Sequence, residues 1–173
     1  MRRSIHLRPR GVLVLGALVA APGCASPRAA PPGSDAQAMR LTTAEERGSF
    51  VGGAEQFTGQ ATVRMLFSPD GPRDFGGATA TFEPGARTAW HSHPAGQTLV
   101  VTEGRGWAQL EGAARVELKA GDVLWTPPGV RHWHGATASS AMTHIALQGE
   151  VNGSVVEWNE PVSEAKYRGQ DAH

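Results

Sequence analysis

The sequence contains a single cysteine and no long hydrophobic segment. Cys24 has no second thiol to pair with, so an internal disulfide cannot stabilise the fold. The longest apolar run, Gly11–Ala21, is too short for a permanent transmembrane helix, which needs about 20 residues. A sustained helical period is also missing. These absences exclude a disulfide-stapled domain, a permanent membrane span in that run and a helical bundle.

Positive charge is scarce outside the beginning of the chain. Five arginines precede the first acidic residue, Asp35, whereas residues 29–173 carry 11 basic and 16 acidic side chains, a balance of −5. A mildly acidic domain lacks the basic stripe that neutralises phosphates. We therefore expect no nucleic-acid partner.

The beginning of the chain has the pattern of an export signal. An arginine-rich start is followed by the apolar run and then by Ala21-Pro22-Gly23-Cys24, which resembles the processing site of bacterial lipoproteins. We predict a signal peptide over residues 1–24, a flexible Ala/Pro/Gly/Ser-rich tether over residues 25–49 and one domain over residues 50–168. Two outcomes stay open: a lipid anchor at Cys24, or cleavage that releases a periplasmic protein.

The domain is predicted to be all-β. Glycine (22 residues) and proline (12 residues) are plentiful, and they separate short runs rich in Val, Thr, Leu and Trp. This pattern is typical of a barrel or sandwich. A capping-box pattern at Thr43 predicts one short helix, and Glu111-Gly112 predicts a hairpin turn. The expected strands are Ala61–Phe67, Ala78–Glu83, Thr88–His93, Gln97–Glu103, Gly106–Glu111, Ala114–Lys119, Asp122–Thr126, His132–Ala136, Thr143–Gln148 and Val155–Trp158.

Histidines cluster in the middle of the domain at informative spacings. His91 and His93 are two apart on a predicted strand, so their side chains leave the same face. Gln97 follows after a Pro-Ala-Gly turn, and His132 lies on a later strand. Three imidazoles and one carboxamide oxygen can therefore meet inside a barrel. Neutral imidazole suits divalent Mn, Fe, Co, Ni, Cu or Zn, and the sequence predicts such a site.

These residues lie in two blocks whose spacing resembles the two motifs of the cupin family. The first block is Gly85-x5-His91-x-His93-x3-Gln97-x6-Gly104, and the second is Gly121-x5-Pro127-x-Gly129-x2-His132. The resemblance implies a cupin double-stranded β-helix, that is, a jelly-roll barrel. The chain departs from the family twice, because Gln97 replaces the usual glutamate and Ala136 an asparagine that often ends the second motif.

The replacement of glutamate by Gln97 changes the charge of the predicted site. A divalent metal with one carboxylate ligand has a net charge of +1, whereas four neutral ligands leave +2. Less donated charge makes the metal a stronger Lewis acid and lowers the pKa of a coordinated hydroxyl. This favours acid–base or lyase chemistry over oxygen chemistry.

Strand parity places further polar side chains beside the predicted metal. His134 shares a face with His132, while His144 and Gln148 share the less apolar face of their own strand. Either histidine could act as a general base. The alternative for both is a ring that only supports the metal ligands or is satisfied within the core. The predicted substrate pocket comprises Ala78, Ala80, Phe82 and Thr88.

Longer stretches resemble a bacterial subgroup that includes the manganese-dependent cupin hydroxynitrile lyases. These stretches are Phe57–Gly59, Phe82–His91, Gly96–Thr102, His132–Thr137, Ala141–Ala146 and Trp158–Val162. The resemblance implies a homo-oligomer in which His144 and Gln148 lie beside the metal. The metal that it implies is manganese, with Fe, Zn, Ni or Co as alternatives. It also implies cleavage or formation of a cyanohydrin such as mandelonitrile.

Two other function classes stay open at this point. A metal-dependent oxygenase of a small aromatic or dicarbonyl compound would consume oxygen, and Gln97 counts against it. A non-catalytic metal-binding module would need no base, and His144 counts against that.

Overall fold

The structure, a computed structural model, describes residues 39–170, and twelve strands with one short helix confirm the all-β prediction. The predicted signal peptide, Cys24 and the tether up to residue 38 lie outside the described residues. The division into leader, tether and domain stays a prediction. The elements are β1 (Ser49–Val51), β2 (Phe57–Thr58), β3 (Ala61–Phe67), β4 (Phe75–Phe82), β5 (Arg87–Thr88), β6 (His91–Ser92), β7 (Gln97–Leu110), β8 (Val116–Lys119), β9 (Val123–Thr126), β10 (His132–Ala136), β11 (Met142–Gly149), β12 (Glu157–Trp158) and α1 (Glu164–Arg168).

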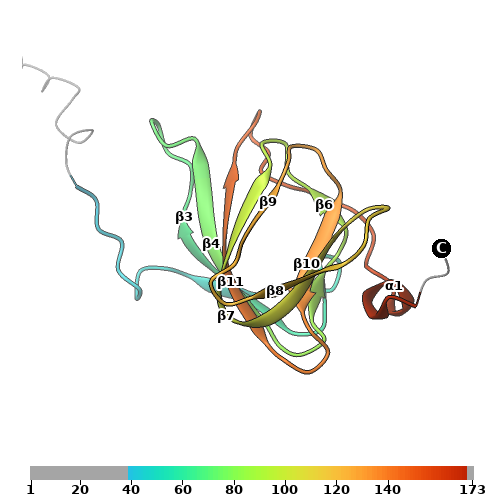
Figure 1. Cartoon of the computed structure of the whole chain (residues 1–173). Helices are drawn as coiled ribbons and strands as arrows, with labels where there is room; N and C mark the ends of the chain where they lie inside the picture. Colours follow the sequence, from blue (N-terminus) through green and yellow to red (C-terminus); the bar gives the residue numbers. More distant parts are fainter. Residues whose placement is uncertain (1–38, 171–173) are drawn as a thin grey trace, which may run out of the picture. The chain divides into compact units, whose positions relative to one another are not determined.

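The strands form two antiparallel sheets that face each other around a shared interior (Figure 1). In the first sheet, called sheet A, the order is β1-β3-β4-β11-β7-β9. In sheet B, β10 pairs with β5, β6 and β7, while β2, β12 and β8 extend it. The arrangement is the jelly-roll type that the sequence predicted, and both sheets turn one apolar face inward.

Strand β7 belongs to both sheets. The sequence predicted two strands here, Gln97–Glu103 and Gly106–Glu111, but they form one continuous strand. Its first half pairs with β11 in sheet A and its second half with β10 in sheet B. Gly104 lies at the crossing with a φ of +71°, and a Cβ there would collide with the Ala141 carbonyl. Only glycine fits such a backbone position without strain.

Other predicted boundaries change for local reasons. The predicted strand Thr88–His93 is split into β5 and β6, because Trp90 between them turns away to pack against Trp133 and Tyr167. The capping-box residues form a turn rather than a helix, in which the Thr43 amide donates to the Glu46 carboxylate over 2.7 Å. The sequence prediction missed β1, β2 and α1, which are all short.

Burial on β11 alternates as the sequence predicted. Met142, His144 and Ala146 are buried, whereas Thr143 and Ile145 between them are partly exposed. The buried set points into the interior and pairs in register with the inward residues of β4. The inward face of sheet A therefore carries His144 toward the histidines of sheet B.

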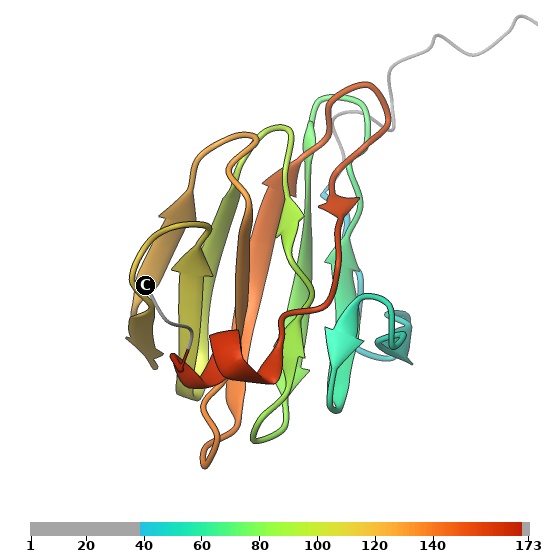
Figure 2. The same cartoon turned by 90° about the vertical axis from the view of Figure 1, so that its right-hand side faces the viewer.

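A second apolar cluster covers the outer face of sheet B. Trp90, Trp133, Val162 and Tyr167 pack together there, with α1 lying across the strands in Figure 2. Ser163 caps α1 by accepting a hydrogen bond from the Lys166 amide over 3.1 Å. Within residues 39–170, no helix has the length and apolar character needed to cross a membrane.

Candidate metal centre

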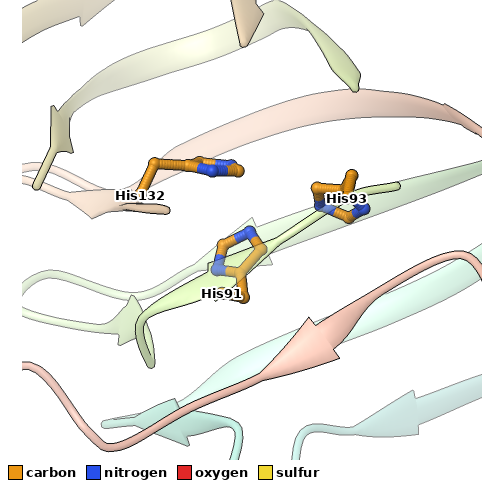
Figure 3. A group of neighbouring side chains, drawn as sticks. All are labelled: His91, His93 and His132. Carbon is orange, nitrogen blue, oxygen red and sulfur yellow. The ribbon is translucent and has the colours of Figure 1, made fainter. Parts of the chain in front are cut away.

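Three histidines from two strands of sheet B meet in the interior. His91 begins β6, His93 follows that strand, and His132 begins β10 directly opposite His91 in the strand register. Their nearest ring nitrogens all lie within 4.8 Å of one another, and the three side chains are 1–3% exposed. Figure 3 shows the three rings approaching from these segments. The sequence prediction that they converge is confirmed.

Each of these imidazoles is held by a main-chain carbonyl. Nδ1 of His91 lies 2.9 Å from the Ala89 carbonyl oxygen, and Nδ1 of His132 lies 2.9 Å from that of Val130. Nδ1 of His93 lies 2.6 Å from the Val155 carbonyl oxygen. Because a carbonyl only accepts, each Nδ1 carries the proton and each Nε2 keeps a lone pair. A hydrogen-bonded Nδ1 of this kind is the usual support of a metal-bound histidine.

Burial keeps the three rings neutral. Loss of solvent lowers the pKa of His91 well below its ordinary value, lowers that of His132, and lowers that of His93 to about 4. Neutral imidazole is the form that binds a metal. Nε2 of His93 is buried without a hydrogen-bond partner among the described residues, so a lone pair faces the cluster unsatisfied. A divalent metal ion fits these three nitrogens.

The carboxamide of Gln97 lies beside the three imidazoles, and its role as a fourth ligand stays a prediction. Gln97 is 4% exposed, and its Oε1 lies 3.2 Å from Nε2 of His132. Its Nε2 donates to Oε1 of Gln148 over 3.4 Å, which directs the oxygen toward the histidines. Since Nε2 of His132 holds a lone pair, two acceptor atoms face each other at this distance. Such a pair is unfavourable alone and favourable when both atoms bind one cation.

The two remaining histidines of the described chain form a buried pair next to the cluster. Nε2 of His144 lies 3.3 Å from Nδ1 of His134, and the His134 ring centre is 5.2 Å from that of His91. Burial lowers the pKa of His144 to about 4 and that of His134 well below its ordinary value. The pair therefore stays neutral and connects sheet A to the metal centre.

The residues predicted to form the substrate pocket lie on the same side as this pair. Phe82 packs its ring 5.6 Å from His144 and 5.8 Å from His134, and Thr88 accepts a hydrogen bond from the His134 amide over 3.1 Å. Ala80 and Ala78 pair with His144 and Ala146 across β4 and β11. All four side chains are buried, and their role in binding stays a prediction.

A cavity of about 190 Å³ reaches the cluster, and its lining includes His132. The sequence analysis did not identify its walls. Alternation along β7 could have found two of them, because Ala108 and Leu110 pair with His134 and His132. The mostly apolar lining comprises Ala108, Gln109, Leu110, Ala113, Ala114, Val116, Leu124, Trp125, Thr126 and His132.

Comparisons with known proteins agree with this geometry. The sequence pattern of the family described as "Cupin domain" matches residues 78–147, which contain all three clustered histidines, Gln97, His134 and His144. The chain is 49% identical over 130 residues to an (R)-mandelonitrile lyase of Granulicella tundricola. That match covers 75% of this chain and 99% of the relative.

Solved structures show the same fold. A cupin-like protein from Thermotoga maritima has 43% identity and a TM-score of 0.67, with 72% of this chain and 94% of that chain covered. A cupin 2 conserved barrel domain protein from Rhodopseudomonas palustris has 14% identity and a TM-score of 0.57, with 70% and 86% covered; this second likeness concerns the fold alone. The chain belongs to the cupin family.

Proposed function

We propose that this cupin is a metal-dependent lyase that cleaves, or in reverse forms, a cyanohydrin. The observation that carries the proposal is the donor set of three neutral imidazoles and one neutral carboxamide, in a chain 49% identical to an (R)-mandelonitrile lyase. Four neutral ligands leave the full charge of a divalent ion at the site. A carboxylate ligand would neutralise part of it.

His91, His93, His132 and Gln97 would hold the ion, with manganese as our first expectation and Fe, Zn, Ni or Co as alternatives. When bound, the ion supplies Lewis acidity that lowers the pKa of a hydroxyl group beside it. The chain itself supplies orientation, because three carbonyls fix the rings and Gln148 fixes the carboxamide.

His144 is the proposed base. Its Nε2 lies 3.3 Å from Nδ1 of His134, and the His144 ring takes the hydroxyl proton of the cyanohydrin. The bond between the carbinol carbon and the nitrile carbon then breaks. Its electron pair leaves with cyanide, the carbinol becomes an aldehyde, and the proton on His144 passes to cyanide. His134 holds the His144 ring in place during both transfers.

Two assays on the purified protein loaded with Mn²⁺ test this proposal. The first measures mandelonitrile cleavage by the release of aldehyde. The second measures oxygen uptake with aromatic and dicarbonyl compounds. We expect aldehyde and cyanide in equal amounts, without oxygen uptake. His132→Ala should lose both metal and turnover. His144→Ala should keep its metal and lose about 10²–10⁴-fold in kcat, as removal of a general base does.

Three outcomes would contradict the proposal. Oxygen uptake without cyanide release would assign the site to an oxygenase. Full turnover in His144→Ala with normal metal content would remove the proposed base. Full turnover after removal of all metal by a chelator would remove the metal from the reaction.

A further inference from the structure

A short C-terminal segment touches two of the three clustered histidines. The β12 segment, residues 155–158, lies outside the residues matched by the family pattern. It contains β12, which pairs antiparallel with β6. In this register Trp158 lies opposite His91 and Glu157 opposite Ser92. Figure 2 shows the course of the chain through this segment toward α1. On its other side β6 pairs with β10. The β12 segment thus keeps the strand that carries His91 from being a sheet edge.

One contact of this segment holds His93 through the main chain. The Val155 carbonyl accepts from Nδ1 of His93 over 2.6 Å, the shortest of the three carbonyl contacts to the cluster. The two residues are 62 positions apart in the chain. The proton position of His93, and with it the lone pair on Nε2, therefore depends on where the β12 segment lies.

A second contact holds His91 through a side chain. The Trp158 ring centre lies 5.0 Å from that of His91, with an interplanar angle of 41°. The indole also contacts Phe57, whose ring centre is 5.7 Å away. The His91 ring centre is also 4.2 Å from that of His132, so His91 contacts the rings of both Trp158 and His132.

The β12 segment is itself attached at its C-terminal end. The Trp90 amide donates to the Glu160 carbonyl over 3.0 Å, and the Asn159 amide donates to the Trp90 carbonyl over 2.8 Å. Trp90 is the residue before His91. These bonds fix the spacing between the indole of Trp158 and the imidazole of His91.

We propose that the β12 segment is a positioning element of the metal centre, which orients His91 and His93 and thereby sets the affinity for the metal. The inference rests on the metal site of the proposed function. A ring that must point its lone pair at an ion loses affinity when it gains rotational freedom. Changes in the groups that orient metal ligands typically cost 10–100-fold in affinity.

The test is the dissociation constant for Mn²⁺ and Co²⁺, measured by competition with a chromophoric chelator, together with the visible absorption of the Co²⁺ protein. The variants are Trp158→Ala, Trp158→Leu and Trp158→Phe. Trp107→Ala is the matched control, because Trp107 is also a half-buried tryptophan but its ring contacts Tyr167 and Arg115 on the outer face of sheet B.

We expect Trp158→Ala and Trp158→Leu to weaken binding 10–100-fold and to alter the Co²⁺ spectrum. Trp158→Phe, which keeps a ring beside His91, should recover most of the affinity. Trp107→Ala should bind like the wild type, even with a comparable loss of thermal stability. If Trp158→Ala fails to fold, the affinities of the Leu and Phe variants test the positioning role.

Equal affinities in wild type, Leu and Phe variants would overturn the positioning role and leave the proposed function intact. An equal loss of affinity in Trp107→Ala and Trp158→Leu would also overturn it, because general destabilisation would then explain the effect. A wild-type protein that binds neither ion would overturn the proposed function, and the inference with it.

Discussion

At the scale of single residues, Gln97 decides the charge of the centre. Its oxygen faces Nε2 of His132 at 3.2 Å, and its nitrogen is occupied by Gln148. The carboxamide oxygen therefore points toward the histidines, as the proposed neutral ligand would. Burial also keeps the three imidazoles neutral, so nothing in the donor set offsets the charge of a divalent ion.

We expect Gln97→Glu to bind metal more tightly and to react more slowly. A carboxylate adds one negative charge to the donor set, which should raise metal affinity at least about tenfold, or about 1.4 kcal/mol. The same charge weakens the Lewis acid, so kcat for cyanohydrin cleavage should fall about tenfold or more. Chelator competition and steady-state kinetics measure the two effects.

Gln60→Glu is the control for this change. It introduces the same charge at an exposed position between β2 and β3, where affinity and kcat should stay at wild-type values. If Gln97→Glu also behaved like wild type in both measurements, Gln97 would not be a ligand.

The positions of the clustered histidines could be predicted from sequence, but the groups that orient their rings could not. His91 and His93 share a strand face because of their spacing, and the second block places His132 opposite them. The Val155 carbonyl and the Trp158 ring depend instead on where a segment more than sixty residues away folds back. No local pattern encodes that return. The predicted roles of His134, His144 and Gln148 stay predictions.

At the scale of elements, the strand runs were predictable and the connections were not. A glycine pair near the middle of β7 looks like a turn in sequence, yet Gly104 and Gly106 lie where one strand passes between sheets. Helix α1 has five residues, too few for a periodic signal, and its place depends on tertiary packing.

Tyr167 anchors α1 to sheet B, and its substitution tests this contact without changing a residue of the candidate site. Its hydroxyl donates to the Ala136 carbonyl over 3.0 Å, and the side chain is 2% exposed. Tyr167→Phe leaves that carbonyl without this partner, so the free energy of unfolding should fall by about 1–2 kcal/mol. Urea denaturation measures it.

Metal affinity should not change in Tyr167→Phe, because α1 covers the outer face of sheet B and the centre lies inside. Arg168→Ala removes an exposed ion pair with Glu164 from the same helix and should leave both quantities unchanged. A loss of metal binding in Tyr167→Phe would show that α1 is coupled to the centre.

At the scale of the whole molecule, five histidines occupy the interior between two sheets. His91, His93, His132, His134 and His144 are all at most 4% exposed, and burial lowers the pKa of each. A core with so many titratable rings is stable only while those rings are neutral. The homo-oligomer and the export expected from the sequence stay predictions.

The metal-free protein should therefore lose stability as the pH falls. In the unfolded chain an imidazole takes up a proton near its ordinary pKa of about 6.5, whereas in the native state His93 and His144 do so only near about 4. Between these values the unfolded state binds more protons, so lowering the pH favours unfolding. Each such ring contributes a slope of up to about 1.4 kcal/mol per pH unit, and the stabilisation is fully present only above about pH 6.5.

Urea denaturation of the chelator-treated protein at about pH 7.5 and about pH 5 measures this loss. His144→Gln, which cannot take up a proton, should show a smaller difference between the two conditions than wild type. Saturating metal should raise stability at the higher pH by about 2.7 kcal/mol at a hundredfold excess over Kd. A metal-free protein equally stable at both values would mean that water reaches these rings, and a centre open to water would not hold its histidines neutral.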